Sequence, residues 1–274
     1  VVADAPAPAV TLPPPAPAPR GTEDNPIPAP PPKYTRTPSA PPEGESAYEA
    51  LVNTRDFLVS RFWEKPDPGK ETSHGYALLD RKSGQAVLID PGFLSIRIMQ
   101  YWVEREKAQV KAILVTHGHI DHVGGVAILK QRFPQALFYA GAKDAQWMTN
   151  AVRYGFPTHK APVPPAPDKK LVGGETLNFG ALQIKVLATP GHTLGSLSYY
   201  WPKEKLLFSG DTLFRRAIGR VDLPNSASMA EEVASIKRAY GPLPDITAVY
   251  PGHGGPTTLG EERGANSYLI GTSK

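Results

Sequence analysis

The sequence contains no cysteine among its 274 residues. This absence excludes disulfide bonds, thiolate nucleophiles and zinc sites built on cysteine. Any metal ion that the chain binds must therefore be held by nitrogen and oxygen donors.

Long apolar runs and dense basic clusters are also absent. Since no run of about 18 apolar residues occurs, we expect no membrane span. The 30 Lys and Arg residues against 26 Asp and Glu residues give a net charge of +4, which does not indicate a nucleic-acid partner. The chain begins Val-Val-Ala, which is compatible with a cytoplasmic protein or with one exported after processing.

Proline is concentrated in residues 1–47, which hold 15 of the 31 prolines and few large apolar residues. Such a segment cannot bury enough surface to offset its ordering entropy, so we expect a disordered, partly polyproline tail or linker. Alternatively, it binds a partner domain that has an aromatic groove. Residues 48–274 are then expected to form one domain.

Within residues 48–274, apolar runs alternate with segments of helical periodicity. Strands are predicted at 76–80, 86–90, 110–115, 136–140, 181–189, 197–201, 205–209 and 246–250. Helices are predicted at 93–108, 122–133, 142–152 and 228–240, with a short last helix capped by Thr258 and Glu261. The alternation indicates an α/β fold with a layered sheet core.

Three histidines and an aspartate lie in THGHIDH, residues 116–122, directly after a predicted strand. His or Asp also follows an apolar strand in VLATPGH, LLFSGD and TAVYPGH. Strands of one layered core can deliver their ends to a common rim, so these four segments suggest one shared site. His74 and His159 have no such context, and we expect them to be ordinary structural histidines.

The spacing of these residues suggests two metal positions. In extended chain, residues i and i+2 point the same way, so His117 and His119 can converge on one point. Asp121 and His122 come where the chain enters a helix and can face a second point. The other candidates are His192, Asp211 and His253. Two cations fit this set if Asp211 bridges them, whereas gathering so many ionisable groups without metal would be costly.

The motifs THGHIDH, TPGHTLGS, SGDTLF and YPGHGG, in this order, resemble the metal-binding motifs of the metallo-β-lactamase superfamily, and most of all its glyoxalase II-like hydrolases. LIDPG, AIGRVDLP and GGPTTLGEERGAN resemble a short, single-domain subgroup of these enzymes. The resemblance covers residues 48–274. It implies an αββα sandwich with a binuclear metal site at the sheet edges.

The resemblance also implies roles for individual residues. The first metal would be held by His117, His119 and His192, and the second by Asp121, His122 and His253, with Asp211 as the bridge. Zinc is favoured, and iron or manganese also suits nitrogen and oxygen ligands. The implied reaction is attack of a metal-bridging hydroxide, oriented by the catalytic Asp121, on the acyl carbonyl of a thioester.

Further residues are candidates for supporting roles. Hydrogen bonds that orient the ligands are expected from Asp90, Thr116 and Thr212, for which ordinary turn roles are the alternative. An acidic part of the substrate could be bound by Arg215, Arg216 and Arg220, because guanidinium matches carboxylate geometry. The alternative for these arginines is surface exposure or structural ion pairing.

Several functions remain open. A glutathione thioester and a different thioester are both compatible, since only 21 residues follow His253 and glutathione-specific enzymes have a longer C-terminal region. A lactonase or other ester hydrolase would use nearly the same ligands. A cysteine-free β-lactamase would not be expected to contain Asp211, and a persulfide dioxygenase would use one iron and fewer ligands. The non-enzymatic alternative is a metal-binding interaction protein that uses the proline-rich tail.

Overall fold

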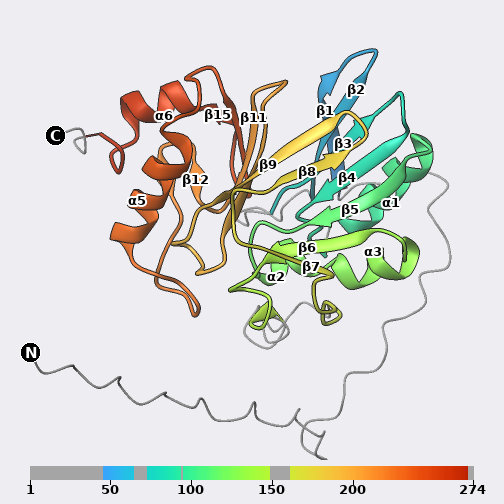
Figure 1. The fold of residues 1–274 in the computed structure, drawn as a ribbon, viewed down its shortest axis with the longest axis horizontal. Helices are drawn as coiled ribbons and strands as arrows, with labels where there is room; N and C mark the ends of the chain where they lie inside the picture. The colour runs from blue at the N-terminus through green and yellow to red at the C-terminus, as the bar shows by residue number, and fades with distance from the viewer. Residues whose placement is uncertain (1–45, 65–72, 94, 149–160, 271–274) are drawn as a thin grey trace, which may run out of the picture. The chain divides into compact units, whose positions relative to one another are not determined.

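The computed structural model describes residues 46–64, 73–93, 95–148 and 161–270 (Figure 1). The predicted tail, residues 1–47, lies outside the described residues except for Ser46 and Ala47. These two residues belong to the first strand, where they pair with Glu64 and Trp63. Strand β1 therefore includes two residues of the segment that the composition assigned to the tail. No helix among the described residues is long and apolar enough to cross a membrane.

The first sheet has seven strands in the order β1-β2-β3-β4-β5-β6-β7. They are β1 (Ser46–Asn53), β2 (Phe57–Glu64), β3 (Gly75–Asp80), β4 (Gln85–Ile89), β5 (Gln109–Leu114), β6 (Leu137–Gly141) and β7 (Lys169–Leu171). Neighbours from β1 to β4 are antiparallel, and those from β4 to β7 are parallel. The carboxyl ends of β4, β5 and β6 consequently meet at one edge of the sheet.

The second sheet has six strands in the order β15-β14-β11-β10-β9-β8. They are β8 (Thr176–Phe179), β9 (Leu182–Ala188), β10 (Leu197–Trp201), β11 (Leu206–Gly210), β14 (Ala248–Pro251) and β15 (Thr257–Thr258). A small hairpin of β12 (Leu213–Phe214) and β13 (Ala217–Ile218) follows β11. Strands β11 and β14 are parallel, so their carboxyl ends also share an edge.

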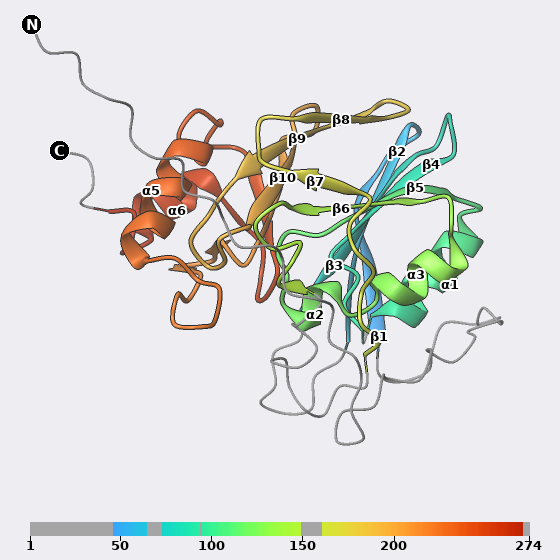
Figure 2. The same cartoon turned by 60° about the horizontal axis from the view of Figure 1, so that its bottom comes forward.

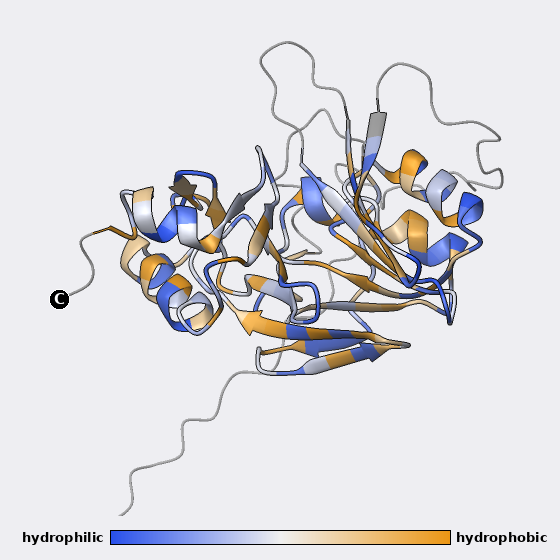
Figure 3. Ribbon diagram, turned by 90° about the horizontal axis from the view of Figure 1, so that it is seen from above, coloured by the Kyte–Doolittle hydropathy of each residue, from blue (hydrophilic) through white to orange (hydrophobic). Residues whose placement is uncertain are grey.

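Helices cover the outer face of each sheet, as Figures 1 and 2 show. They are α1 (Ile96–Arg105), α2 (Ile120–Val123), α3 (Val126–Arg132), α5 (Met229–Tyr240) and α6 (Leu259–Ala265). Alternate residues of a strand serve different layers: Leu79 packs under α1 and α3, whereas Leu78 packs between the sheets. The hydropathy colouring in Figure 3 shows apolar segments gathered along the strands and on the helix sides that face them. This is the predicted α/β fold, an αββα sandwich.

Two helix predictions differ from the structure. The helix predicted at 122–133 is divided into α2 and α3 at Gly124 and Gly125, because the amide of Gly125 donates to the carbonyl of Pro91 at 2.7 Å. The described part of the helix predicted at 142–152 begins with turns, at residues 142–147, and residues 149–152 lie outside the described residues. The predicted caps of α5 and α6 are confirmed, since Ser228 and Thr258 accept from the amides three residues on.

Candidate metal centre

The predicted ligands lie just beyond strand ends of both sheets. From the first sheet, the segment after β5 carries His117, His119, Asp121 and His122. From the second sheet, the segments after β9, β11 and β14 carry His192, Asp211 and His253 respectively. The described structure brings all seven together in three overlapping groups, within each of which the donor atoms lie within 4.8 Å of one another.

Three imidazoles converge on one point. The Nδ1 atom of His119 lies 3.0 Å from Nε2 of His117 and 2.9 Å from Nε2 of His192. His192 Nδ1 lies 2.7 Å from the carbonyl oxygen of Arg220, which can only accept, so this nitrogen donates. The Nε2 atom is therefore the nitrogen of His192 that faces the shared point. Nitrogens that share a tetrahedral zinc are separated by about 3.4 Å, close to the spacing observed.

A second group lies beside the first. The Oδ2 atom of Asp121 is 3.1 Å from Nε2 of His253 and 3.4 Å from Nε2 of His122. Asp211 lies between the groups: its Oδ1 is 3.3 Å from Nε2 of His122, and its Oδ2 is 3.5 Å from Nε2 of His253 and 3.6 Å from Nε2 of His192. Asp211 is thus placed to contact ions in both positions.

Asp90 orients two of the histidines. It follows β4 with a φ of 48°, a region that non-glycine residues seldom adopt. Its Oδ1 accepts from the Thr116 amide, and its Oδ2 accepts from the Thr116 hydroxyl, both at 2.7 Å. Because that hydroxyl donates to Asp90, its 3.1 Å contact with Nδ1 of His117 makes the imidazole the donor. Nδ1 of His122 also lies 3.1 Å from Oδ2 of Asp90. The Nε2 atoms of both histidines are left to face the centre.

The two groups differ in their electrostatics. Burial, with the nearby His192, lowers the pKa of His119 to about 4, so its imidazole is neutral. Burial alone would lower the pKa of His253, but the charge of Asp211 and hydrogen bonds to both aspartates raise it to about 10. Conversely, His122 holds the pKa of Asp211 well below its usual range despite burial. In the three-histidine group, His119 thus offers a lone pair, whereas a cation at the second group would displace protons.

The residues fit divalent cations. Nε2 of His122 and Oδ1 of Asp211 are buried and have no hydrogen-bond partner among the described residues. Buried polar atoms are normally hydrogen-bonded, and these two face the same space between carboxylate and imidazole groups. Imidazole and carboxylate donors suit zinc, iron and manganese. The arrangement could therefore hold two ions that share Asp211.

Comparison with known proteins gives the family. A model of the Metallo-beta-lactamase superfamily matches residues 73–253, which include every predicted ligand. This chain belongs to the metallo-beta-lactamase superfamily. Membership of this superfamily, together with the similarity to the probable metallo-hydrolase YqgX of Bacillus subtilis, supports a metal-dependent hydrolase as the general class of this protein.

Relatives within the superfamily have names that indicate different activities. The hydroxyacylglutathione hydrolase GloC of Haemophilus influenzae is 34% identical over 188 residues, which are 67% of this chain and 87% of that protein. The structure of BLEG-1 B3 metallo-beta-lactamase is 34% identical with a TM-score of 0.66, covering 74% of this chain and 99% of that chain. TTHA1623 in a di-iron-bound form is 36% identical with a TM-score of 0.62, covering 74% and 98%. The superfamily fold is therefore shared, and the metal differs from zinc in at least one neighbour.

The structure places two of the three predicted orienting residues against the proposed ligands. Thr116 and Asp90 contact ligands as described above, whereas the hydroxyl of Thr212 donates to Thr189 at 3.1 Å. Thr212 therefore belongs to a hydrogen-bonded network beside the centre, and the described structure shows no bond from its hydroxyl to a ligand.

The three predicted substrate-binding arginines also differ. The guanidinium of Arg216 lies 3.4 Å from Glu262, and that of Arg220 makes two 2.7 Å bonds to Asp222. Arg220 contributes to the centre through its carbonyl, which orients His192. Arg215 is exposed, and its side chain makes no hydrogen bond within the described part of the chain. Arg215 is thus the arginine of this set that is most available to an anion.

Sequence reasoning missed Glu232, a fully buried carboxylate on α5. Its Oε2 accepts from the backbone amide of His192 and so fixes the segment that carries this histidine. The signal was present in the helix: Glu232, Ile236 and Tyr240 lie four residues apart on the buried face. A charged residue at such a position needs a specific partner.

We expect Glu232→Gln to change how stability depends on pH. Burial, followed by the charge of Asp211, raises the pKa of Glu232 from 4.5 to about 8. The stability due to the protonated carboxyl is complete below pH 4.5 and is lost as the pH rises towards 8, where the unfolded chain has released this proton. Denaturant unfolding of metal-free protein should show a loss of a few kcal/mol across this window in the unmutated chain and a smaller loss in Glu232→Gln. Parallel curves would contradict this assignment.

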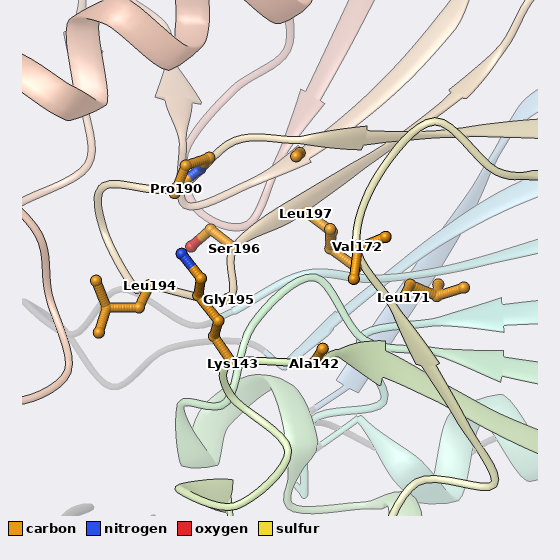
Figure 4. A pocket seen from close by; sticks show the side chains of 10 residues that line it. Ala142, Lys143, Leu171, Val172, Pro190, Leu194, Gly195, Ser196 and Leu197 are labelled. Carbon is orange, nitrogen blue, oxygen red and sulfur yellow. The ribbon is translucent and has the colours of Figure 1, made fainter. Parts of the chain in front are cut away.

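A shallow depression lies beside the His192 segment, outside the centre. Figure 4 shows its mostly apolar lining, which includes Ala142, Lys143, Val172, Pro190, Leu194 and Leu197. None of the seven predicted ligands lines it. The depression therefore adds no polar group to the proposed metal centre.

Proposed function

We propose that residues 48–274 form a binuclear metal-dependent hydrolase that cleaves thioesters of the hydroxyacylglutathione type. The observation that supports this proposal most strongly is the pair of ligand groups that share Asp211. Two divalent ions held there would lower the pKa of a water molecule to near neutrality and polarise an acyl carbonyl. Zinc is the ion we favour, with iron or manganese as alternatives.

The chain's own residues then position and deprotonate the reactants. Asp121 is the catalytic residue in this proposal, since its side chain is 28% exposed and its Oδ2 lies within 3.4 Å of two ligand histidines. A carboxylate there can accept a hydrogen bond from the attacking water and orient its lone pair towards the acyl carbon. The leaving thiol has a pKa near 8.5, so it departs as a thiolate with little need for a general acid.

Two aromatic side chains flank the accessible side of the centre. His119, Asp121 and His253 are partly exposed, whereas the other four proposed ligands are buried. The rings of Trp147 and His119 are 5.4 Å apart, and those of Phe214 and His253 are 6.3 Å apart. A substrate would approach between Trp147 and Phe214, where the exposed Arg215 could meet a carboxylate on its thiol portion.

The test is hydrolysis of S-lactoylglutathione by purified protein whose bound metal has been quantified. Turnover would support the thioester proposal. Inactivity with two ions bound would exclude this substrate and direct the search to other thioesters, lactones and simple esters. Inactivity against every ester would favour a metal-binding interaction protein instead.

We expect His119→Ala to lose metal and activity together. His119 Nδ1 contacts both other imidazoles of its group, so its loss removes one of three imidazole donors from that position. We predict a decrease in kcat of roughly 10²-fold or more, comparable with loss of one transition-state contact. Metal analysis and turnover of the same sample check this result, and unchanged thermal unfolding of the metal-free protein shows that the domain still folds. Full activity with a full metal complement would contradict the ligand assignment.

Hydrolysis of β-lactams is the second candidate, because BLEG-1 is a B3 metallo-beta-lactamase at 34% identity. Asp211 argues against it, since a cysteine-free β-lactamase is not expected to carry a bridging carboxylate. Turnover of a chromogenic cephalosporin in the same assay separates the two candidates. Faster cleavage of the cephalosporin than of every thioester would favour this second function.

A further inference from the structure

Asp144 is a fully buried carboxylate in the turn that follows β6. Its Oδ2 accepts from the amide of Gly118 at 2.9 Å and from the hydroxyl of Thr193 at 2.7 Å. Its Oδ1 accepts from the amide of Gly195 at 2.8 Å and from the side-chain amide of Asn225 at 2.7 Å. Each oxygen therefore has two donors, which offset part of the cost of burying the carboxylate. Burial still outweighs them and raises the pKa of Asp144.

Three of these four donors belong to the segments that carry the three-histidine group. The fourth, Asn225, lies before α5, and its carbonyl accepts from the amide of Leu194 in the His192 segment. Gly118 separates His117 from His119, and Thr193 directly follows His192. Asp144 touches none of these imidazoles in the described structure. It instead bonds the chain beside each of them and joins a segment of the first sheet to one of the second.

The segments approach too closely for Asp144 to be an incidental neighbour. A Cβ atom added to Gly195 would lie 2.5 Å from the backbone nitrogen of Asp144, and one added to Gly141 would overlap the carbonyl oxygen of Gly195. The segments around the Asp144 side chain are thus packed too closely to accept an added Cβ atom at Gly195 or Gly141.

We propose that Asp144 is a positioning residue for the three-histidine metal position, where it holds the His117–His119 segment against the His192 segment. The Asp121, His122 and His253 position should depend on it much less, because Asp144 bonds the segment after β5 only at Gly118, before α2 begins. The described structure shows no bond from Asp144 to the segment that carries His253. The inference rests on the proposed metal centre, but not on the thioester assignment.

The experiment measures Zn²⁺ affinity at each position separately by competition with a chromophoric chelator. His253→Ala leaves the three-histidine position, and His192→Ala leaves the other. We expect Asp144→Asn to lower Zn²⁺ affinity by about 10- to 100-fold in the His253→Ala protein, the range found when a group that orients a ligand is lost. In the His192→Ala protein we expect a change of less than about 3-fold. Asp121 and His122 lie beyond Gly118 in α2, where His122 keeps its contact with Asp90, and the segment that carries His253 has no bond to Asp144 within the described residues.

Asp80→Asn is the matched control. Asp80 is also a buried carboxylate that joins two turns, accepting from Ser83 at 2.6 Å and from the amide of Ala181 at 3.0 Å. Asp80 is the last residue of β3. The other end of this strand is the one beside the metal centre, because His74, directly before β3, bonds to the segment that carries His253. Asp80→Asn should therefore lower stability without selective loss of Zn²⁺ affinity.

Thr193→Val provides a second variant in case Asp144→Asn does not fold, since it removes one donor and keeps the carboxylate. Selective loss at the three-histidine position in either variant supports the proposal. Equal losses at both positions, or no loss in the His253→Ala protein, would overturn it while leaving the metal centre in place. Failure of the unmutated chain to bind Zn²⁺ would overturn the metal centre and this proposal together.

Discussion

Replacement of Asp211 by alanine is expected to abolish nearly all hydrolytic activity and to reduce the number of bound metal ions. The carboxylate contacts histidines of both groups, at 3.3 Å from His122 and 3.6 Å from His192. Its loss removes a ligand from both positions and leaves Asp121 as the remaining carboxylate among the proposed ligands. We expect kcat to fall by roughly 10³-fold or more, because stabilisation of the transition state by both ions is weakened.

Metal analysis and kinetics on the same preparation measure this effect. Asp222→Asn is a suitable control because Asp222 is an exposed carboxylate whose partner is the exposed Arg220. Exposed ion pairs contribute little to stability, so this variant should retain both metal and activity. An Asp211→Ala protein that binds two ions with unchanged kcat would show that the two positions do not share this residue.

Much of the fold could be predicted because its strands are nearly continuous apolar runs. Strands β3, β4, β10 and β11 and the second half of β5 are buried on both faces, and such strands stand out between turn signals. The sequence pattern does not predict the first two strands, β1 and β2. The structure shows a register shift in their pairing between Ala50 and Val52, which breaks the regular alternation that a sequence pattern needs.

The seven candidate ligands could be found because each follows a strand, and strand ends of a layered core meet at shared edges. Asp144 follows β6 in the same way, yet it binds backbone amides and hydroxyls instead of facing the ligands. Its partners are up to 81 residues away in sequence, so no local pattern marks them. Glu232 differs in part: its position on the buried face of α5 could be inferred from the helical pattern, but its partner, the amide of His192, lies 40 residues away.

The arginines show a second limit of sequence reasoning, because a side-chain type does not reveal which partner the residue has in the fold. A guanidinium near a bridging aspartate suits an anionic substrate, but in the structure Arg216 bonds to Glu262, and the carbonyl of Arg220 serves as the acceptor for His192. Backbone roles of this kind are independent of side-chain type and cannot be inferred from composition. Residue identity therefore predicted which side chains the structure brings together better than it predicted the residues that position them.

Gly252→Ala is expected to disrupt the centre although glycine carries no ligand atom. A Cβ atom at this position would overlap Oδ1 of Asp211 and would lie 2.6 Å from Cε1 of His122. The backbone cannot move away without losing bonds, since the Gly252 amide donates to Gly210 at 2.8 Å and its carbonyl accepts from His74 at 2.7 Å. Asp211 and His122 must therefore shift, and both are proposed ligands.

We expect Gly252→Ala to lower kcat by roughly 10²-fold, comparable with loss of one key electrostatic contact, and to lower stability by about 1–3 kcal/mol through overpacking. Gly255→Ala is the matched control, because no atom lies within 4 Å of its added Cβ. Metal content, kcat and thermal unfolding of both variants provide the measurement. Equal behaviour of the two would mean that the space beside Asp211 is larger than the structure shows. A selective effect of Gly252→Ala would show that the centre requires an empty Cβ position as strictly as it requires its ligands.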